Sequence, residues 1–345
     1  MLGGSGYGSA SDRADLAIVV VSTNEVHWLD RCLTTVFEHA GTATLEVIVV
    51  DNSSTDGTRE FVESRFPRAH VVTSPNHGFA YGNNRGLEHA DARYLLLLNP
   101  DTEIRDGNFG ELVDLLDARP ETGLAGVRQI TADGELWPTI RRFPSISRAL
   151  GEALFCERWP VHPSWSGERL LDWDAYEHER PCDWTSGSFM LARREALLSA
   201  GLLDERFFIY SEEPDLCLRI KRAGWDVRHL PQMTIVHHAG KGGVRPRMVA
   251  QVAYTRRQYA RKHFGRLYRA AFLSAFAVGQ AIRAVGTGGG EAAARRREGA
   301  RRALRTLFGR ETPPFGAPPA TAVDPVPASL NGRGALAHAA LEEVL

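Results

Sequence analysis

The 345-residue sequence has only four cysteines, and their positions argue against a cysteine-based scaffold. Cys32, Cys156, Cys182 and Cys217 are scattered, with no CxxC pair and no spacing typical of metal ligands. A zinc ribbon or a disulfide-stapled domain is therefore not expected. This usage is typical of a reducing compartment, and we expect a cytoplasmic protein.

Long apolar runs are also missing. The first fifteen residues are rich in Gly, Ser and Asp, and no apolar run precedes a small-residue cleavage site, so no secretory signal is predicted. The uncharged stretch at 270–282 has 13 residues, fewer than the roughly 18 to 20 that a spanning helix needs. No GxGxxG follows the first predicted strand, which lowers the case for a dinucleotide enzyme.

The charge is unevenly distributed along the chain. The formal net charge of -1 combines about -13 over residues 1–240, +15 over 241–310 and -3 over the last 35 residues. Arginines flank the uncharged stretch, which favours an amphipathic helix lying in the plane of an anionic membrane. A basic helix packed on the domain and a solvated tail are the alternatives. Nucleic-acid binding is not expected, because residues 291–310 lack interleaved aromatic side chains.

The first hundred residues alternate between strand and helix patterns. The β-branched runs at 16–21 (LAIVVV) and 45–50 (LEVIVV) predict strands buried on both faces, as in a parallel sheet. Helical spacing of apolar residues lies between them. Further elements are expected as a helix that starts at a capping box over 53–56, a strand at 70–73, a helix at 79–90 and a strand at 94–98. The pattern predicts a doubly wound α/β domain, with ligands at the carboxyl ends of its strands.

The rest of the chain is less regular. Expected elements are a helix at 107–118, a strand at 124–130, a hairpin turn at 133–134, an irregular insertion at 137–182, ordered structure at 183–192, a helix at 213–223 and strands at 226–230 and 234–237. We predict a disordered start (1–14), one domain over 15–265 with halves at 15–105 and 106–265, a basic helical extension (266–310) and a disordered proline-rich tail (311–345).

Short polar segments follow the predicted strands. They are Ser22-Thr23-Asn24, Asp51-Asn52-Ser53-Ser54, the glycine-containing segment 76–84, and Asn99-Pro100-Asp101. An acid such as Asp51 can accept hydrogen bonds from a base or a ribose, although a turn or helix-cap role fits equally well. The carboxylate of Asp101 is placed to hold a divalent cation, but Asn-Pro-Asp is also an ordinary turn.

Three acids, Glu212, Glu213 and Asp215, stand together where a helix begins near Pro214. The helix dipole favours acids at this end, which explains one of them. Clustered like charges can raise the pKa of a carboxylate toward a value useful for a general base. Downstream, His237 ends a strand and has either a metal-binding or a purely structural role.

Several motifs in order resemble the family 2 glycosyltransferases with the GT-A fold, and the rhamnosyltransferase-like branch in particular. They are VVVSTNE, VIVVDNSSTDGT, NHGFAYGNNRG, LLLLNPDTEI, DWTSGSFMLARREAL, GLLDERFFIYSEEPDLCLRIKRAGW and IVHHAGKGG, and they cover residues 16–265 together with RRQYARKHFG. The resemblance implies an inverting enzyme that uses Mg or Mn to move a sugar from a nucleotide diphosphate to an acceptor hydroxyl.

The resemblance also implies roles for individual residues. Nucleotide-sugar binding falls on Ser22, Thr23, Asn24, Asp51, Ser53, Asn83, Asn99 and Asp101, the acceptor side on Trp184, Ser186, Gly187 and Glu212, the metal on Asp101 and His237, and the base on Glu213, with Asp215 as the alternative. Asn99 replaces the first acid of the family's DxD motif. Glu213 stands where the family often has Asp.

The expected reaction is a single displacement that inverts the anomeric carbon. The best match for the donor is dTDP-rhamnose, and the expected acceptor is lipid-linked or a polysaccharide at the cytoplasmic face of the membrane. A galactosyl, galactofuranosyl or glucosyl transferase that uses a UDP-sugar is the alternative enzyme. A nucleotide-sugar-binding protein without turnover is the alternative of a different class, because Asn99 weakens the metal motif.

Overall fold

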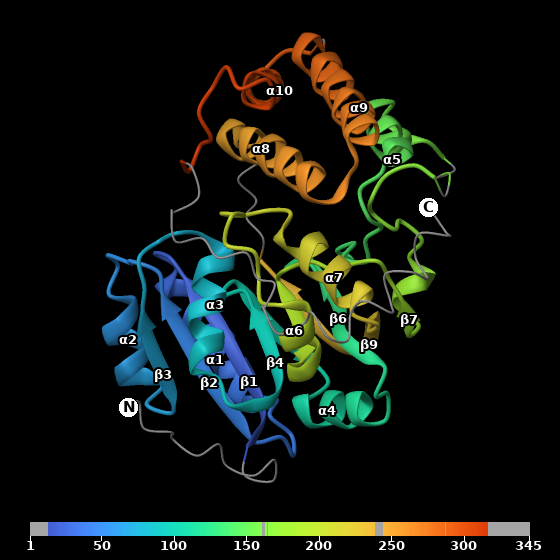
Figure 1. Ribbon diagram of the computed structural model, residues 1–345. Helices are drawn as coiled ribbons and strands as arrows, with labels where there is room; N and C mark the ends of the chain where they lie inside the picture. Colours follow the sequence, from blue (N-terminus) through green and yellow to red (C-terminus); the bar gives the residue numbers. More distant parts are fainter. Residues whose placement is uncertain (1–12, 161–162, 164, 239–243, 287, 317–345) are drawn as a thin grey trace, which may run out of the picture.

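The structure is a computed structural model that describes residues 13–160, 163, 165–238, 244–286 and 288–316. Most of the two termini that the sequence predicts to be disordered lies outside these residues. The glycine-containing segment after His238 lies outside them as well. The described residues form a layered α/β body with a group of helices above one end of its sheet (Figure 1).

A nine-stranded sheet forms the centre of the molecule. Its strand order is β3 (Ala69–Thr73), β2 (Leu45–Asp51), β1 (Ala14–Ser22), β4 (Ala92–Leu98), β8 (Phe189–Arg193), β6 (Thr122–Ile130), β9 (Asp226–His237) and β5 (Thr102–Asp106), and β7 (Arg180–Pro181) pairs with β9. β5, β7 and β8 run against the direction of the other strands. The predicted α/β class with a mostly parallel sheet is therefore confirmed.

The apolar strand runs are buried on both faces of the sheet. In β1, Leu16 and Ile18 pack into one hydrophobic layer, whereas Ala17 and Val19 pack into the other. The first layer is covered by α1 (Val26–Glu38), α2 (Thr58–Arg65) and α4 (Phe109–Asp117), and the second by α3 (Phe79–His89), α6 (Arg194–Ala200) and α7 (Glu212–Arg222). This two-sided burial is why the strand sequences are almost continuously apolar.

Some local predictions were wrong. The capping box at 53–56 does not start α2, which begins at Thr58 after Gly57 in a left-handed conformation (φ 81°). Ser53 instead donates its hydroxyl hydrogen bond to the carbonyl of Ser74 at 3.0 Å. A tertiary contact has therefore replaced the local cap, and Asp56 accepts the first-turn N–H of Thr58 at 3.2 Å.

Elements in the second half also differ from the predictions. The sequence pattern gave no sign of β5, a short strand held by its pairing with β9. The insertion at 137–182 contains a helix, α5 (Ile146–Ala153), capped by Ser145, and two short 3-10 helices, η1 (Cys156–Arg158) and η2 (Asp174–Tyr176). The two strands expected at 226–230 and 234–237 are one strand, β9, with a register irregularity opposite Val127 and Arg128.

The basic part of the chain folds into α8 (Pro246–His263), α9 (Arg266–Val285) and α10 (Glu291–Leu307). Together with α5 these helices form what we call the helical layer. Its helices lie above the carboxyl end of the sheet in Figure 1. Phe272 of α9 packs with Ala149 and Ala260, and Phe276 packs on α8 and α10. The uncharged stretch therefore has one face packed inside the protein. Among the described residues, no helix meets the length and apolarity required to cross a membrane.

Candidate functional site

The carboxyl ends of β1 and β2 form the first part of the candidate site. Ser22 and Asp51 stand opposite each other in the parallel register, and Asn52 donates its N–H to the carbonyl of Ser22 at 2.9 Å. The Asp51 carboxylate is 8% exposed and accepts the N–H of Ser54 at 2.8 Å. The hydroxyl of Ser22 is buried without a partner among the described residues. The two apolar strands therefore end in polar side chains.

Two residues with left-handed backbone shape the loops beyond these strand ends. Asn24 has φ 56° and Ser53 has φ 61°. The side-chain oxygen of Asn24 accepts the N–H of Thr55 at 2.7 Å, so the two loops are tied together. Thr23 lies half-buried beside them. These contacts hold Ser22, Asn24, Asp51 and Ser53 around one end of the sheet, as the sequence analysis expected.

The segment after β4 brings Asp101 to the same end of the sheet. Thr102 pairs with His237 in the antiparallel register of β5 and β9, which places the Asp101 carboxylate 3.4 Å from Nε2 of His237. Both side chains are largely buried, and Nδ1 of His237 has no partner among the described residues. Strand pairing thus joins an acid and a histidine that lie far apart along the chain.

This pair has the donor atoms that a Mg or Mn ion accepts, namely a carboxylate oxygen and an imidazole nitrogen. Across the described residues, however, no group of three or more His, Cys, Asp or Glu side chains comes together in a way that could hold a metal. Asp101 and His237 would therefore be the protein's side chains for holding such an ion. The neighbouring His238 is engaged elsewhere, at 2.8 Å from Glu103 and stacked on Trp28.

Three acids, Glu212, Glu213 and Asp215, lie in the first turn of α7. Oε1 of Glu213 accepts the N–H of Gly187 at 3.4 Å, and a Cβ on Gly187 would lie 3.1 Å from the Glu213 side chain. Burial raises the pKa of Glu213, while hydrogen bonds and the charge of Arg141 act in the opposite direction. Burial followed by repulsion from Glu213 raises the pKa of Glu212 well above its usual range, and Oε2 of Glu212 has no partner among the described residues.

One short segment connects the two acidic regions. The carbonyl of Ser188 accepts the N–H of Asn99 at 3.1 Å, and the N–H of the preceding residue, Gly187, points to Glu213. The loop that carries Asp101 and the start of α7 therefore lie on either side of residues 187–188. Residues 187–188 therefore link two acidic segments that are more than a hundred positions apart in the sequence.

Asp215 lies in a different environment, although it is only two residues from Glu213. It is fully buried, with Oδ1 at 2.7 Å from both Lys262 and His263 and Oδ2 at 2.9 Å from Arg219. Burial alone would raise its pKa, but the hydrogen bond from His263 and the charges of Arg219 and Lys262 outweigh burial and hold the pKa far below its usual range. Asp215 is consequently poorly suited to the alternative role of general base.

Other predicted residues are engaged within the protein. Trp184 is 9% exposed and donates its indole N–H to the carbonyl of Arg142 at 2.9 Å. Asn83 is 1% exposed and donates to the carbonyl of Phe79 one turn earlier at 2.9 Å. The hydroxyl of Ser186 accepts that of Ser188 at 3.1 Å. These groups shape the walls of the site, and the structure gives Asn83 and Trp184 little surface for contact with a ligand.

Two charged residues at the site were missed by the sequence analysis. Arg141 lies over the Trp184 ring at 5.5 Å and acts electrostatically on Glu213, but nothing distinguished it within an irregular segment. Glu25 directly follows Asn24, so its position next to a recognised motif was a usable signal. Burial and the charges of Asp101 and Asp56 raise the pKa of Glu25 to about 7.

Comparison with known proteins identifies the family of the chain. Residues 17–177 match the model of the family described as glycosyl transferase family 2. The chain is 31% identical over 238 residues to N-acetylglucosaminyl-diphospho-decaprenol L-rhamnosyltransferase of Mycobacterium tuberculosis, covering 65% of this chain and 76% of that protein. It is 22% identical to rhamnosyltransferase WbbL of Escherichia coli, covering 64% and 83% of the two chains.

Solved structures show a similar fold. The mannosyltransferase of Pyrobaculum calidifontis, solved with GDP-Man and Mn²⁺, superposes with a TM-score of 0.52 at 17% identity, covering 89% of this chain and 91% of that one. Given this fold and its similarity to the mycobacterial relative, the chain belongs to the family 2 glycosyltransferases and is rhamnosyltransferase-like.

Proposed function

We propose that this glycosyltransferase moves L-rhamnose from dTDP-rhamnose to a hydroxyl group of a lipid-linked or polysaccharide acceptor, with inversion at the anomeric carbon. The observation that carries the proposal is the link through Gly187 and Ser188, which puts the Asp101 loop beside Glu213. A transferase needs a diphosphate-binding group and a base within the length of one sugar. The names of the mycobacterial and Escherichia coli relatives support rhamnose as the sugar.

The nucleotide binds at the ends of β1 and β2 in this proposal. Asp51 accepts hydrogen bonds from the base or ribose, as a carboxylate at the end of a buried strand is suited to do. The free hydroxyl of Ser22 faces a polar edge, and the tied loops that carry Thr23, Asn24 and Ser53 frame it. Asn99 contributes an uncharged side chain next to the diphosphate.

Asp101 and His237 would hold the divalent cation, Mg or Mn. The bound ion would supply positive charge to balance the negative charge that develops on the departing nucleotide diphosphate. Because Asn99 replaces one acid, the protein itself contributes a single carboxylate at this position. The chain's own role is to orient these two side chains, which the pairing of β5 with β9 accomplishes.

Glu213 is the proposed general base. Its carboxylate lies at the start of α7, and its burial raises its pKa, so it accepts a proton more readily than an exposed glutamate does. It takes the proton of the acceptor hydroxyl as the oxygen attacks the anomeric carbon from the face opposite the diphosphate. That carbon is inverted, and no covalent sugar intermediate is needed.

Glu212, Ser186, Gly187 and Trp184 form the acceptor side in this proposal. The pKa of Glu212 is raised well above its usual range, so its carboxyl takes up a proton more readily than an exposed glutamate does, and in the protonated form it can donate a hydrogen bond to an acceptor oxygen. Trp184 and Gly187 act by shaping the wall against which Glu213 rests. We place the reaction at the cytoplasmic face of the membrane, where a lipid-linked acceptor presents its sugar.

A donor panel tests the proposal. The purified chain is incubated with dTDP-rhamnose, UDP-galactose, UDP-galactofuranose, UDP-glucose and GDP-mannose, with Mg or Mn, and with a polyprenyl-diphosphate-linked N-acetylglucosamine acceptor. We expect rhamnosylated product and release of dTDP from the first donor alone. Transfer from a UDP-sugar instead would replace rhamnose as the sugar while retaining the chemistry. Donor binding without any transfer would refute Glu213 as a working base.

A further inference from the structure

A cavity of about 410 Å³ lies between η1, the start of α8, the end of α9 and the first half of α10. Four arginines line it, Arg158, Arg283, Arg296 and Arg297, together with apolar side chains such as Phe155, and no Asp or Glu is among its lining residues. The guanidinium groups of Arg158 and Arg283 lie 5.0 and 4.9 Å from the centre of the Phe155 ring. The fold therefore gathers cations around one aromatic side chain.

The nearest acids, Glu152 and Glu157, act on Arg283 through their charges, but each is closest to an arginine outside the cluster. Glu157 pairs with Arg169, and Glu152 lies 3.8 Å from Arg256. Arg283 and Arg297 donate hydrogen bonds to backbone carbonyls, those of Glu152 at 2.8 Å and Gly288 at 2.7 Å. Grouped guanidinium groups without carboxylates fit the oxygens of a phosphate group, which they can bind in a bidentate manner.

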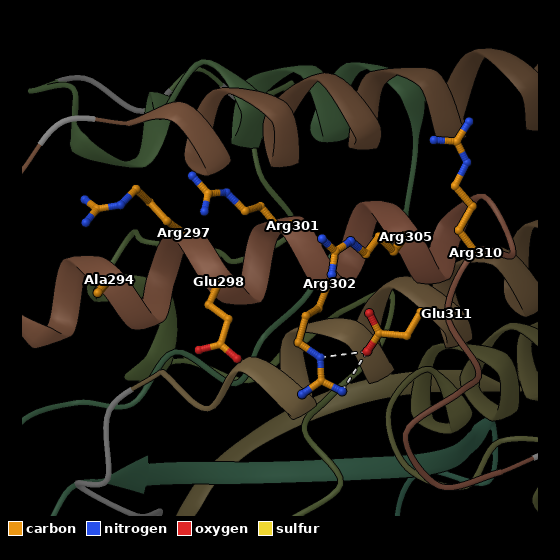
Figure 2. A pocket seen from close by; sticks show the side chains of 8 residues that line it. All are labelled: Ala294, Arg297, Glu298, Arg301, Arg302, Arg305, Arg310 and Glu311. Atoms are coloured by element: carbon orange, nitrogen blue, oxygen red, sulfur yellow. Dashed lines mark hydrogen bonds and ion pairs between the residues drawn. The ribbon is translucent and has the colours of Figure 1, made fainter.

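The basic surface continues along α10. Arg297 also lines a second hollow of about 770 Å³ in which arginines outnumber acids, because its other charged lining residues are Arg301, Arg302, Arg305, Arg310, Glu298 and Glu311. Figure 2 shows Arg297, Arg301 and Arg305 along one side of the helix, whereas Arg302 turns away toward Glu311 at 2.7 Å. This row of like charges is longer than a single small anion needs, and it fits an extended array of phosphates.

Exposed apolar side chains border the same region. Trp159, which follows Arg158, is 45% exposed, and Val285, close to Arg283, is 79% exposed. Val285 shares the outer face of α9 with Val278 and Leu267, which are 52% and 88% exposed, because spacings of seven and eleven residues bring side chains back to one side of a helix. A soluble anion gives no reason for such a stripe, but a bilayer does, because its apolar layer lies beneath its phosphates.

We propose that the outer face of α9, the arginine cavity and the arginine row of α10 form a docking surface for an anionic phospholipid bilayer. A lipid phosphate occupies the cavity, and Trp159 and Val285 enter the boundary between headgroups and acyl chains. The surface contains none of the residues proposed for sugar transfer, so it can be tested separately from the proposed function. It would hold the enzyme at the membrane without a spanning helix in the described part of the chain.

Co-sedimentation of the full chain with vesicles tests this surface. We expect binding to vesicles of phosphatidylglycerol and phosphatidylcholine, little binding to phosphatidylcholine alone, and weaker binding as salt rises. The triple variant Arg158→Gln, Arg296→Gln, Arg297→Gln should bind the anionic vesicles about 100-fold more weakly. Val285→Glu should weaken binding about tenfold by placing a charge in the apolar stripe.

A variant matched in charge provides the control. Replacing Arg65, Arg68 and Arg105, exposed arginines of the sheet domain, with Gln should leave vesicle binding within about threefold of the unaltered chain. Equal thermal unfolding temperatures for all variants would exclude misfolding as the cause of any loss.

Three results would overturn the proposal. The first is anionic-vesicle binding by the cavity variant equal to that of the unaltered chain. The second is displacement from vesicles by inorganic phosphate at concentrations too low to screen charge, which would make the cavity a site for a soluble anion. The third is displacement by an equally low concentration of a nucleic-acid oligonucleotide, which would make the arginine row a nucleic-acid surface.

Discussion

Glu213 and Asp215 lie in the same turn of α7 and both are buried, yet their pKa values are shifted in opposite directions. The buried carboxylate of Glu213 accepts a backbone N–H and has no directly paired cation among the residues that the structure describes, and its pKa is raised. Asp215 is surrounded by Arg219, Lys262 and His263, and its pKa is lowered. A buried acid without a paired cation is ready to take a proton, whereas one with paired cations holds the structure together.

The same contrast distinguishes the proposed site of sugar transfer, which contains Glu213, from the junction between α8 and the rest of the protein. At this junction, which we define as the contacts of Asp204 and Asp215 with α8, Lys262 bridges the two acids at 2.7 Å from each. The basic helices therefore contribute to the sheet domain the cations that neutralise its buried acids. In the described part of the chain, α8 provides no such cation to Glu213, on which the more distant charge of Arg141 acts.

The largest effect is expected from Glu213→Gln, which removes the proposed base but keeps its size. The kcat for transfer should fall by about 10² to 10⁴, because a general base contributes a factor of this order. Titration calorimetry should find donor affinity within about twofold of the unaltered enzyme. Glu212→Gln is the matched control and should retain more activity, since Glu212 is placed on the acceptor side and is not the proposed base. Near-normal turnover of Glu213→Gln would move the base elsewhere.

Asp215→Asn should disrupt the junction instead. It leaves buried cations without their acid, so the free energy of unfolding should fall by about 3 to 5 kcal/mol in a urea titration. The control is Asp226→Asn, an acid 48% exposed and 3.7 Å from Arg228, which should cost less than about 1 kcal/mol. Equal stability of the two variants would show that the junction is not structural.

Asp101→Asn should act on the donor through the metal. Donor affinity in the presence of Mn should fall about 10- to 100-fold, the range typical of losing one contact to a metal site. A chelator should weaken donor binding to the unaltered enzyme and have little further effect on the variant. Glu103→Gln, which removes an acid paired with His238, serves as the control. Identical metal titrations for Asp101→Asn and the unaltered enzyme would contradict the assignment.

The smallest and most specific effect concerns pH. Glu213 must be ionised to act as a base, so its raised pKa predicts that kcat falls with decreasing pH at values above those of an ordinary glutamate. Asp215 has a lowered pKa, so its contribution to stability is present above the unfolded-state pKa of about 3.9 and is lost as pH falls through its folded-state pKa. Circular dichroism should therefore show folded protein at mildly acidic pH where activity has already been lost.

Much of the fold was predictable from the sequence, because strands that are buried on both faces consist almost entirely of apolar residues. The runs at 16–21 and 45–50 became β1 and β2 with small changes of boundary. β5 has no such apolar run. Its residues are polar at one end, and it is held as a strand by its pairing with β9. The capping box at 53–56 failed because Ser53 found a partner in Ser74, which local sequence rules do not take into account.

The sequence by itself determined which residue types stand at the strand ends and that three acids begin α7. Only the tertiary structure decided which of those acids is neutralised, because Lys262 and His263 lie more than forty positions downstream and reach Asp215 through the packing of α8. Strand pairing likewise decided that His237 faces Asp101. Proximity of distant residues follows from burial of the whole core, and it is this proximity that sets the charge state of each acid.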